Sequence, residues 1–220
     1  MASWIVHLRI ADELAYGFSF DHEKFIVGNI APDSGEIMND GTYQPSKEIT
    51  HWKTNQNNRS IQPDDFYKEY LITCKTDNRP FYLGYFCHLI TDLNWINKII
   101  AKTKRKLGVD FAKPRLQHKV QSDWYALDML YLRQHNNMNS FKILNNIKSF
   151  DNVYLDYFSK NAITNKIKQI CDFYNNNTVS PDRKFEYLTM DEVDEFVFNT
   201  TDIIRSRVRA FYDDSPAYSI

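Results

Sequence analysis

The 220-residue sequence contains no run of about eighteen consecutive apolar residues and no basic N-terminal segment followed by a long apolar stretch. We therefore expect neither a transmembrane segment nor a secretory signal, and a cytoplasmic protein. Three cysteines without CxxC spacing argue against a disulfide framework and a thiolate zinc site. Six glycines are few for a sheet protein with many tight turns, so helices are favoured. The absence of a Pro/Gly/Ser-rich linker predicts one domain over residues 1–220.

Neither sign of charge dominates the sequence. Lysine and arginine number 27, aspartate and glutamate 28, and the net charge is −1. Binding to a phosphate backbone requires several clustered cations, so we expect no stable nucleic-acid complex. The basic residues 102–106 fit the C-terminal end of a helix, where cations complement the helix dipole. No feature of the composition indicates an oligomeric state.

Apolar residues recur at helical spacing along most of the chain, with no alternation long enough to require a sheet. A first helix over residues 3–17 places His7 on its inward face. A second, from Asp21 to about Gly28, leaves Asp33 in the turn that follows, and residues 34–62 form a long polar loop. The pattern predicts an all-α, irregular helical bundle. The other helices are expected over residues 63–74, 81–106, 122–134, from 140 onwards, 162–174 and 190–212.

The strongest local signal for chemistry is the pair His88 and Asp92. Their i, i+4 spacing places both side chains on one face of the apolar helix over residues 81–106. A buried carboxylate is costly unless it is paired or bound to a metal. Taken alone, the pair fits a hydrogen bond in the core as well as it fits two ligands of one metal ion.

Three further residues favour the metal. His7 alone would be read as a packed core histidine, and Asp33 as a turn-former. His51 stands in a polar loop without an evident structural task. Three histidines and two aspartates supply the nitrogen and oxygen ligands that zinc, manganese or iron accept, and an aspartate can bridge two ions. A dinuclear site is therefore a plausible interpretation.

The context of these residues adds further signals. They are Trp4 and His7 in the first helix, the turn from Asn29 to Asp33, the dipeptide Thr50-His51, and the run Gly-Tyr-Phe-Cys-His-Leu-Ile-Thr-Asp over residues 84–92. In this order the chain resembles the zinc-dependent phospholipase C family, whose wider relatives include fungal single-strand-specific nucleases. The resemblance covers about the first half of the chain. It implies an all-α domain that hydrolyses phosphate esters at a multinuclear zinc site. Asp33, His51, His88 and Asp92 would surround one ion, and Asp92 would bridge to a second ion held by His7.

The family also holds a third ion, through a histidine soon after the His-x-x-x-Asp pair and a later His-x-x-x-Glu or His-x-x-x-Asp. Neither stands at the expected place in this sequence. Asp123, beside the expected helix cap Ser122, is the nearest substitute for a metal ligand, ahead of His118 and Asp128. Interaction with the helix dipole is by itself a sufficient explanation for Asp123, and it is favoured over the ligand role.

Together these features predict a hydrolase that acts on a small phosphoester or a phospholipid head group through water activated by a metal. Zinc is the expected cofactor, with two ions, although other divalent transition metals fit the same ligands. Asp33 is the candidate catalytic base as well as a ligand. Two alternatives stay open: a nucleotide or nucleic-acid phosphodiesterase on the same fold, and a non-catalytic metal-binding helical module. A dependence of activity on added metal would separate the enzymes from the module.

Overall fold

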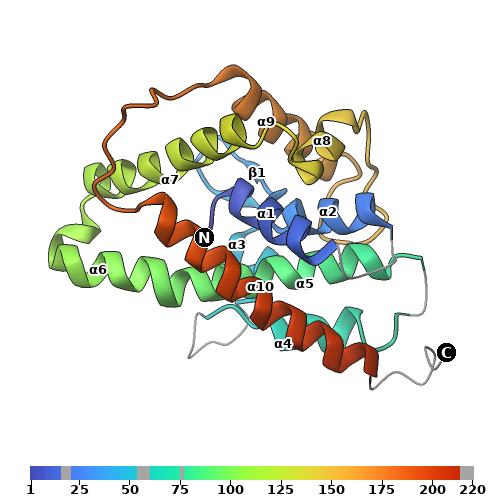
Figure 1. Cartoon of the computed structure of the whole chain (residues 1–220). Coiled ribbons are helices and arrows are strands. Elements are labelled where there is room, and N and C mark those ends of the chain that lie inside the picture. The colour runs from blue at the N-terminus through green and yellow to red at the C-terminus, as the bar shows by residue number, and fades with distance from the viewer. Residues whose placement is uncertain (16–20, 54–59, 75–76, 214–220) are drawn as a thin grey trace.

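The computed structural model describes residues 1–15, 21–53, 60–74 and 77–213 (Figure 1). Within them the fold is all-α, as predicted, apart from a short antiparallel pair of strands, β1 (Glu36–Ile37) and β2 (Tyr43–Gln44), in which Glu36 faces Gln44. The helical segments are α1 (Trp4–Ala15), α2 (His22–Ile30), η1 (Ala31–Asp33), α3 (Lys47–Thr50), α4 (Pro63–Tyr70), α5 (Arg79–Trp95), η2 (Ile96–Ile100), α6 (Ala101–Leu107), η3 (Gly108–Ala112), α7 (Pro114–Gln134), α8 (Asn139–Asn146), α9 (Ala162–Asn176) and α10 (Met190–Asp213).

The helix boundaries differ from the sequence prediction at several places. The Asp21 side chain accepts a hydrogen bond from the Lys24 amide and caps α2, which continues to Ile30 instead of ending near Gly28. The expected helix start at Ser122 is wrong. Helix α7 begins at Pro114, because the fixed φ of proline suits the first helical position. Helix α4 stops at Tyr70, several residues before the predicted end.

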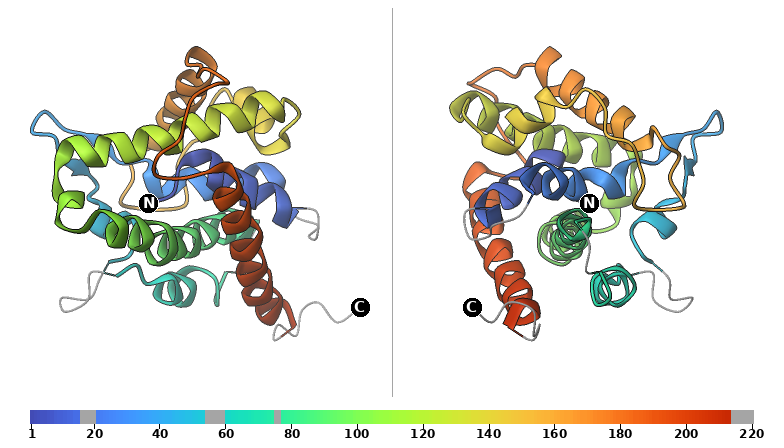
Figure 2. Two further views of the ribbon diagram at one scale, coloured as in Figure 1. Left: turned by 60° about the vertical axis from the view of Figure 1, so that its left-hand side comes forward. Right: turned by 90° about the vertical axis from the view of Figure 1, so that its right-hand side faces the viewer.

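The central element is the long helical run from α5 through η2 to α6. Its middle, from Tyr85 to Asp92, is buried at every position, as expected of a helix enclosed by others. The segment η2 is a π-helical turn, which has wider hydrogen bonding than an α-helix. Figure 2 shows α4 along one side of this run and α10 crossing it.

Helix α2 packs closely against α5 through two glycines. A Cβ atom on Gly84 would lie 2.1 Å from the Phe25 carbonyl oxygen, and one on Gly28 would lie 2.1 Å from the Phe81 carbonyl oxygen. No side chain fits at either position, so the two backbones touch. This contact fixes the distance between the end of α2 and the turn of α5 that carries His88.

The remaining helices enclose this pair. Helix α1 packs against α2, α8 and α10, and α7 and α9 lie on the side of α1 away from α5 (Figure 1). Trp95 of α5 meets Trp124 of α7 and Phe196 of α10, with ring centroids 5.3 and 4.9 Å apart, so three helices share one apolar core. Among the described residues, no helix is both long and apolar enough to cross a bilayer.

Candidate metal centre

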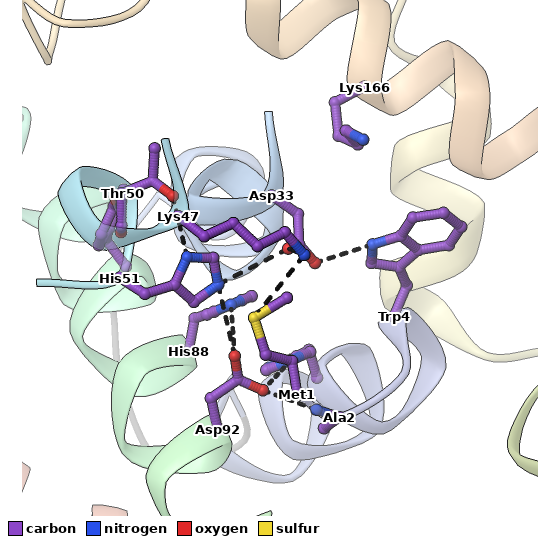
Figure 3. Close-up of polar contacts among 12 residues, drawn as sticks. Met1, Ala2, Trp4, Asp33, Lys47, Thr50, His51, His88, Asp92 and Lys166 are labelled. Carbon is purple, nitrogen blue, oxygen red and sulfur yellow. Dashed lines mark hydrogen bonds and ion pairs between the residues drawn. The ribbon is translucent and has the colours of Figure 1, made fainter. Parts of the chain in front are cut away.

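Five residues predicted as metal ligands converge on one buried place, although they are distant in sequence (Figure 3). His7, His51, His88 and Asp92 are fully buried, and the side chain of Asp33 is 9% exposed. Helices α1 and α5, the turn η1 and the residue after α3 supply them. The ligand atoms form two groups, His7 with His88 and Asp92, and Asp33 with His51 and His88.

Asp92 lies at the middle of this cluster. Its Oδ1 accepts a hydrogen bond of 2.6 Å from the Ala2 amide and lies 3.4 Å from His7 Nε2. Its Oδ2 lies 3.4 Å from His51 Nε2 and 3.5 Å from His88 Nε2. The two oxygens therefore face opposite parts of the cluster.

The orientation of His88 is fixed by the end of α2. Its Nδ1 lies 2.7 Å from the Asn29 carbonyl oxygen, which can only accept, so Nδ1 carries the proton. The lone pair of the neutral ring is then on Nε2, which points into the cluster. A hydrogen bond from the other ring nitrogen to a carbonyl is the usual support of a metal-binding histidine. The His7 ring stacks on His88, with centroids 3.8 Å apart.

His51 is held through the residue before it. The Thr50 hydroxyl lies 2.9 Å from His51 Nδ1, and the Thr50 carbonyl accepts a 2.5 Å hydrogen bond from the Tyr85 hydroxyl. Tyr157 donates in turn to Tyr85. Trp52 then turns the chain away with a positive φ of 52°, an uncommon conformation for a large side chain. These contacts tie α3 to α5 and leave His51 Nε2 facing Asp33 and Asp92.

Asp33 lies between the cluster and a cavity of about 650 Å³. Its Oδ2 accepts a hydrogen bond of 3.0 Å from Trp4 Nε1, and its Oδ1 lies 3.6 Å from His51 Nε2 and 3.9 Å from Lys47 Nζ. Asp33 and Trp4 both line the cavity. A molecule in the cavity can therefore reach the cluster at Asp33.

The spacing of these atoms fits metal coordination better than hydrogen bonding. Separations of 3.4 to 3.6 Å are too long for hydrogen bonds. Two ligands about 2.0–2.1 Å from a tetrahedral zinc ion lie about 3.3 Å apart. The buried atoms without a hydrogen-bond partner among the described residues include the candidate ligand atoms His7 Nε2, His51 Nε2, His88 Nε2 and Asp92 Oδ2. Buried polar atoms are normally satisfied, so this convergent set is suited to a cation.

The charges around the cluster also favour a cation. Burial lowers the pKa of His7 to about 4 and lowers that of His51, so both rings stay neutral and keep their lone pairs. Burial would raise the pKa of Asp92, but the Met1 amino group and the nearby histidines hold it well below its usual value. Burial likewise opposes ionisation of Asp33, yet His88, His51 and Lys47 lower its pKa. Two carboxylates and neutral imidazoles are the protonation states that bind zinc.

The structure does not bring Asp123 to this cluster. Asp123 lies inside α7, where Arg183 forms an ion pair with it at 2.8 Å. Its second oxygen accepts the amides of Glu186 and Tyr187. These partners satisfy the carboxylate, and we leave Asp123 out of the ligand set. Asp128 is likewise engaged elsewhere, by Ser3 and Tyr174.

Two lysines beside the site were not identified from the sequence. Lys47 is the first residue of α3, which ends just before His51, and Lys166 lies on α9. Both lysines line the cavity. A signal for Lys166 was present, because it stands between Ile163, Ile167 and Ile170 on the apolar face of an amphipathic helix. No pattern indicated Lys47, which lies in the polar loop.

Comparison with known families supports the zinc site. The family model described as zinc dependent phospholipase C matches residues 3–172. The chain belongs to the zinc-dependent phospholipase C family. The match extends beyond the first half of the chain and includes all five convergent residues. Further comparison found no curated protein and no solved structure that matches this chain. The family and the buried His/Asp groups together support a zinc hydrolase.

Proposed function

We propose that this protein hydrolyses a phosphate ester, of the type found in phospholipid head groups, at a two-zinc centre that opens into the cavity beside Asp33. The observation that carries the proposal is the set of convergent, buried and unpartnered ligand atoms at the edge of a cavity of about 650 Å³. A cavity of this size accommodates a small phosphoester.

The ligand atoms that have no hydrogen-bond partner suggest how the residues divide between two metal positions. His88 has one free nitrogen, Nε2, because Nδ1 is bonded to Asn29, so it can serve one ion. Asp92 has two oxygens that face different histidines. We infer that Asp33, His51, His88 and Asp92 would hold one ion, and that Asp92 and His7 would hold a second.

When bound, zinc ions supply a Lewis acid that lowers the pKa of water and offsets charge on phosphate oxygens. The surrounding protein residues orient the groups that act on the water and the phosphate. Trp4 holds Asp33 Oδ2, which leaves Asp33 Oδ1 toward His51 and the cavity. Asp33 is ionised at neutral pH and can accept the proton of an attacking water at Oδ1, which makes it the candidate general base. Burial keeps His7 and His51 neutral, and the buried side chains exclude solvent from this side of the site.

Asp92→Asn is the decisive variant. It keeps the size of the side chain but removes the charge that would lie between two cations. We expect zinc affinity to fall about tenfold or more, the scale on which even supporting residues of a metal site act, and phosphodiesterase activity to fall with it. Zinc content by atomic absorption and hydrolysis of a chromogenic phosphodiester measure the two effects.

Asp128→Asn is the matched control, because Asp128 is also a buried aspartate but bonds Ser3 and Tyr174. It should keep both zinc and activity. Full zinc content and full activity in Asp92→Asn would contradict the proposed centre. Normal zinc binding by the wild-type protein without hydrolysis of any phosphoester would instead support a non-catalytic metal-binding module.

A further inference from the structure

Two lysines from different parts of the chain face the cavity. Lys47 of α3 lies 3.9 Å from Asp33, and its side chain is 32% exposed. Lys166 of α9 lies near Trp4, with its ammonium 5.5 Å from the centre of the Trp4 ring (Figure 3). Both residues line the cavity. The metal centre, through Asp33, and the two ammonium groups therefore share one space.

The position of Lys166 is costly for a cation. The residue is only 8% exposed, and its ammonium donates a 2.7 Å hydrogen bond to Gln169, which is neutral. Among the described residues, no carboxylate forms an ion pair with it. Burial lowers the pKa of Lys166, while nearby Asp33 raises it and Lys47 lowers it further. Both lysines therefore contribute positive charge to the same cavity.

Binding of metal would increase the excess of positive charge in the cavity. Asp33 is a cavity carboxylate that acts on both lysines, and its charge would be engaged once it bound an ion. Glu36 also lines the cavity, but it is exposed on β1 and is screened by solvent. The occupied site then holds two dications and two lysines against two carboxylates. Like charges gathered in a partly buried space are stabilised by an anion between them.

We propose that Lys47 and Lys166 form an anion-binding subsite beside the metal centre, which selects substrates with an anionic head group over those with a quaternary ammonium. Lysine binds phosphate as a point charge, and two lysines from different helices that line one cavity can contact different oxygens. A choline-like cation would instead meet two ammonium groups. The choice of head group rests on the proposed hydrolase function, whereas anion binding does not.

The first experiment measures anion binding without any reaction. Inorganic phosphate is titrated calorimetrically into the zinc-loaded wild type, Lys166→Met and Lys168→Met. Methionine keeps the unbranched stem of Lys166 and removes its charge. Lys168 is an exposed lysine on the same helix and is the matched control. We expect Lys166→Met to bind phosphate about tenfold more weakly, and Lys168→Met to bind as the wild type does.

Lys47→Met gives an independent reading, because Lys47 is part-exposed and its replacement should not disturb folding. It should also weaken phosphate binding. Equal phosphate affinity in the wild type and both cavity variants would overturn the subsite, even if the enzyme were active. Phosphate that is bound through the metals alone would give this result.

The second experiment compares two short-chain lipids at equal concentration, phosphatidylinositol phosphate and phosphatidylcholine. The wild type should prefer the anionic lipid, and Lys166→Met should lose about tenfold of this preference while Lys168→Met keeps it. A wild-type preference for choline, or a preference unchanged by Lys166→Met, would overturn the proposed selectivity. Hydrolysis of neither lipid, with phosphate binding still dependent on Lys166, would contradict the lipid function and leave the anion subsite standing.

Discussion

His7 shows how burial of a proposed metal ligand affects the stability of the metal-free protein. Burial and His88 lower its pKa from 6.5 to about 4, so between these values the unfolded chain binds a proton that the folded chain does not. The free energy of unfolding therefore falls as the pH falls through this window. The share of His7 is at most about 3 kcal/mol, since one pKa unit corresponds to about 1.4 kcal/mol.

His7→Gln removes the contribution of His7 to the pH dependence of the free energy of unfolding. In the presence of a chelator, we expect the variant to lose less stability than the wild type between about pH 7 and pH 4, as measured by urea unfolding. His88, whose pKa is raised by Asp92 against the effect of burial, contributes with the opposite sign. His135→Gln, at an exposed position, is the control. Parallel stability curves for His7→Gln and the wild type would contradict the assigned shift.

At the level of single residues, local spacing predicted some of the site and missed the rest. His88 and Asp92 could be predicted because one helix sets their geometry. Asp123 could not be judged in the same way, because its partner Arg183 lies 60 residues further along the chain. Lys166 is close to the site only because α9 packs beside η1, a contact that no local pattern encodes.

Among the secondary-structure elements, the crossing of α2 and α5 depends on Gly28 and Gly84. Gly84→Ala would place a methyl group 2.1 Å from the Phe25 carbonyl oxygen, so the helices must separate. We expect a loss of roughly 1–3 kcal/mol in the free energy of unfolding, the usual cost of overpacking. In an open helix the same change would stabilise the protein, because alanine is the better helix former. Whether Gly84→Ala lowers or raises the free energy of unfolding therefore tests the contact between the two helices.

Gly84 lies one turn before His88, and the Asn29 carbonyl that orients His88 lies on the opposing helix. Separation of the helices should therefore weaken zinc binding as well as folding. Competition with a coloured chelator measures this effect. An unchanged zinc affinity in a destabilised Gly84→Ala protein would show that the crossing supports the fold without setting the geometry of the ligands.

Long, strongly periodic helices could be predicted from sequence, whereas the short elements within the polar loop could not. Helix α10 was expected over 190–212 and is found from Met190 to Asp213. The segment after Asp33 was expected to be a long polar loop, and it contains the short elements β1, β2 and α3. Each of these is too short to produce a periodic signal. Residues 54–59 of this loop lie outside the described part of the chain.

For the molecule as a whole, metal should order the segment between Asp33 and His51. Both ends of this segment carry proposed ligands, and its middle is largely exposed, so a bound ion would tie together a region with few apolar contacts. We expect zinc to slow hydrogen exchange of the amides in residues 34–50 more than those in α10. Equal protection of this segment with and without zinc would contradict its link to the metal.

The assembly of the whole site was accessible from sequence only through the family resemblance. His7, Asp33, His51 and His88 come from four separate elements, and periodicity places each residue only on its own helix face. Contacts such as the 2.6 Å bond between Arg9 and Asp194 show how far apart in sequence the packed segments lie. The all-α class followed from composition and spacing, but the way the helices cross did not.

The π turn η2 separates the central helical run into two parts with different tasks. Each α-helical residue turns the chain by about 100°, and the wider π turn accommodates one additional residue. Before it, α5 directs His88 and Asp92 inward; after it, Thr103 is buried and Lys106 bonds the Glu186 carbonyl. In evolutionary terms the turn is equivalent to a one-residue insertion that leaves the ligand-bearing half in place. The outer half, which leads to the cavity wall at Phe111, can therefore diverge and change what the cavity admits without moving the ligands.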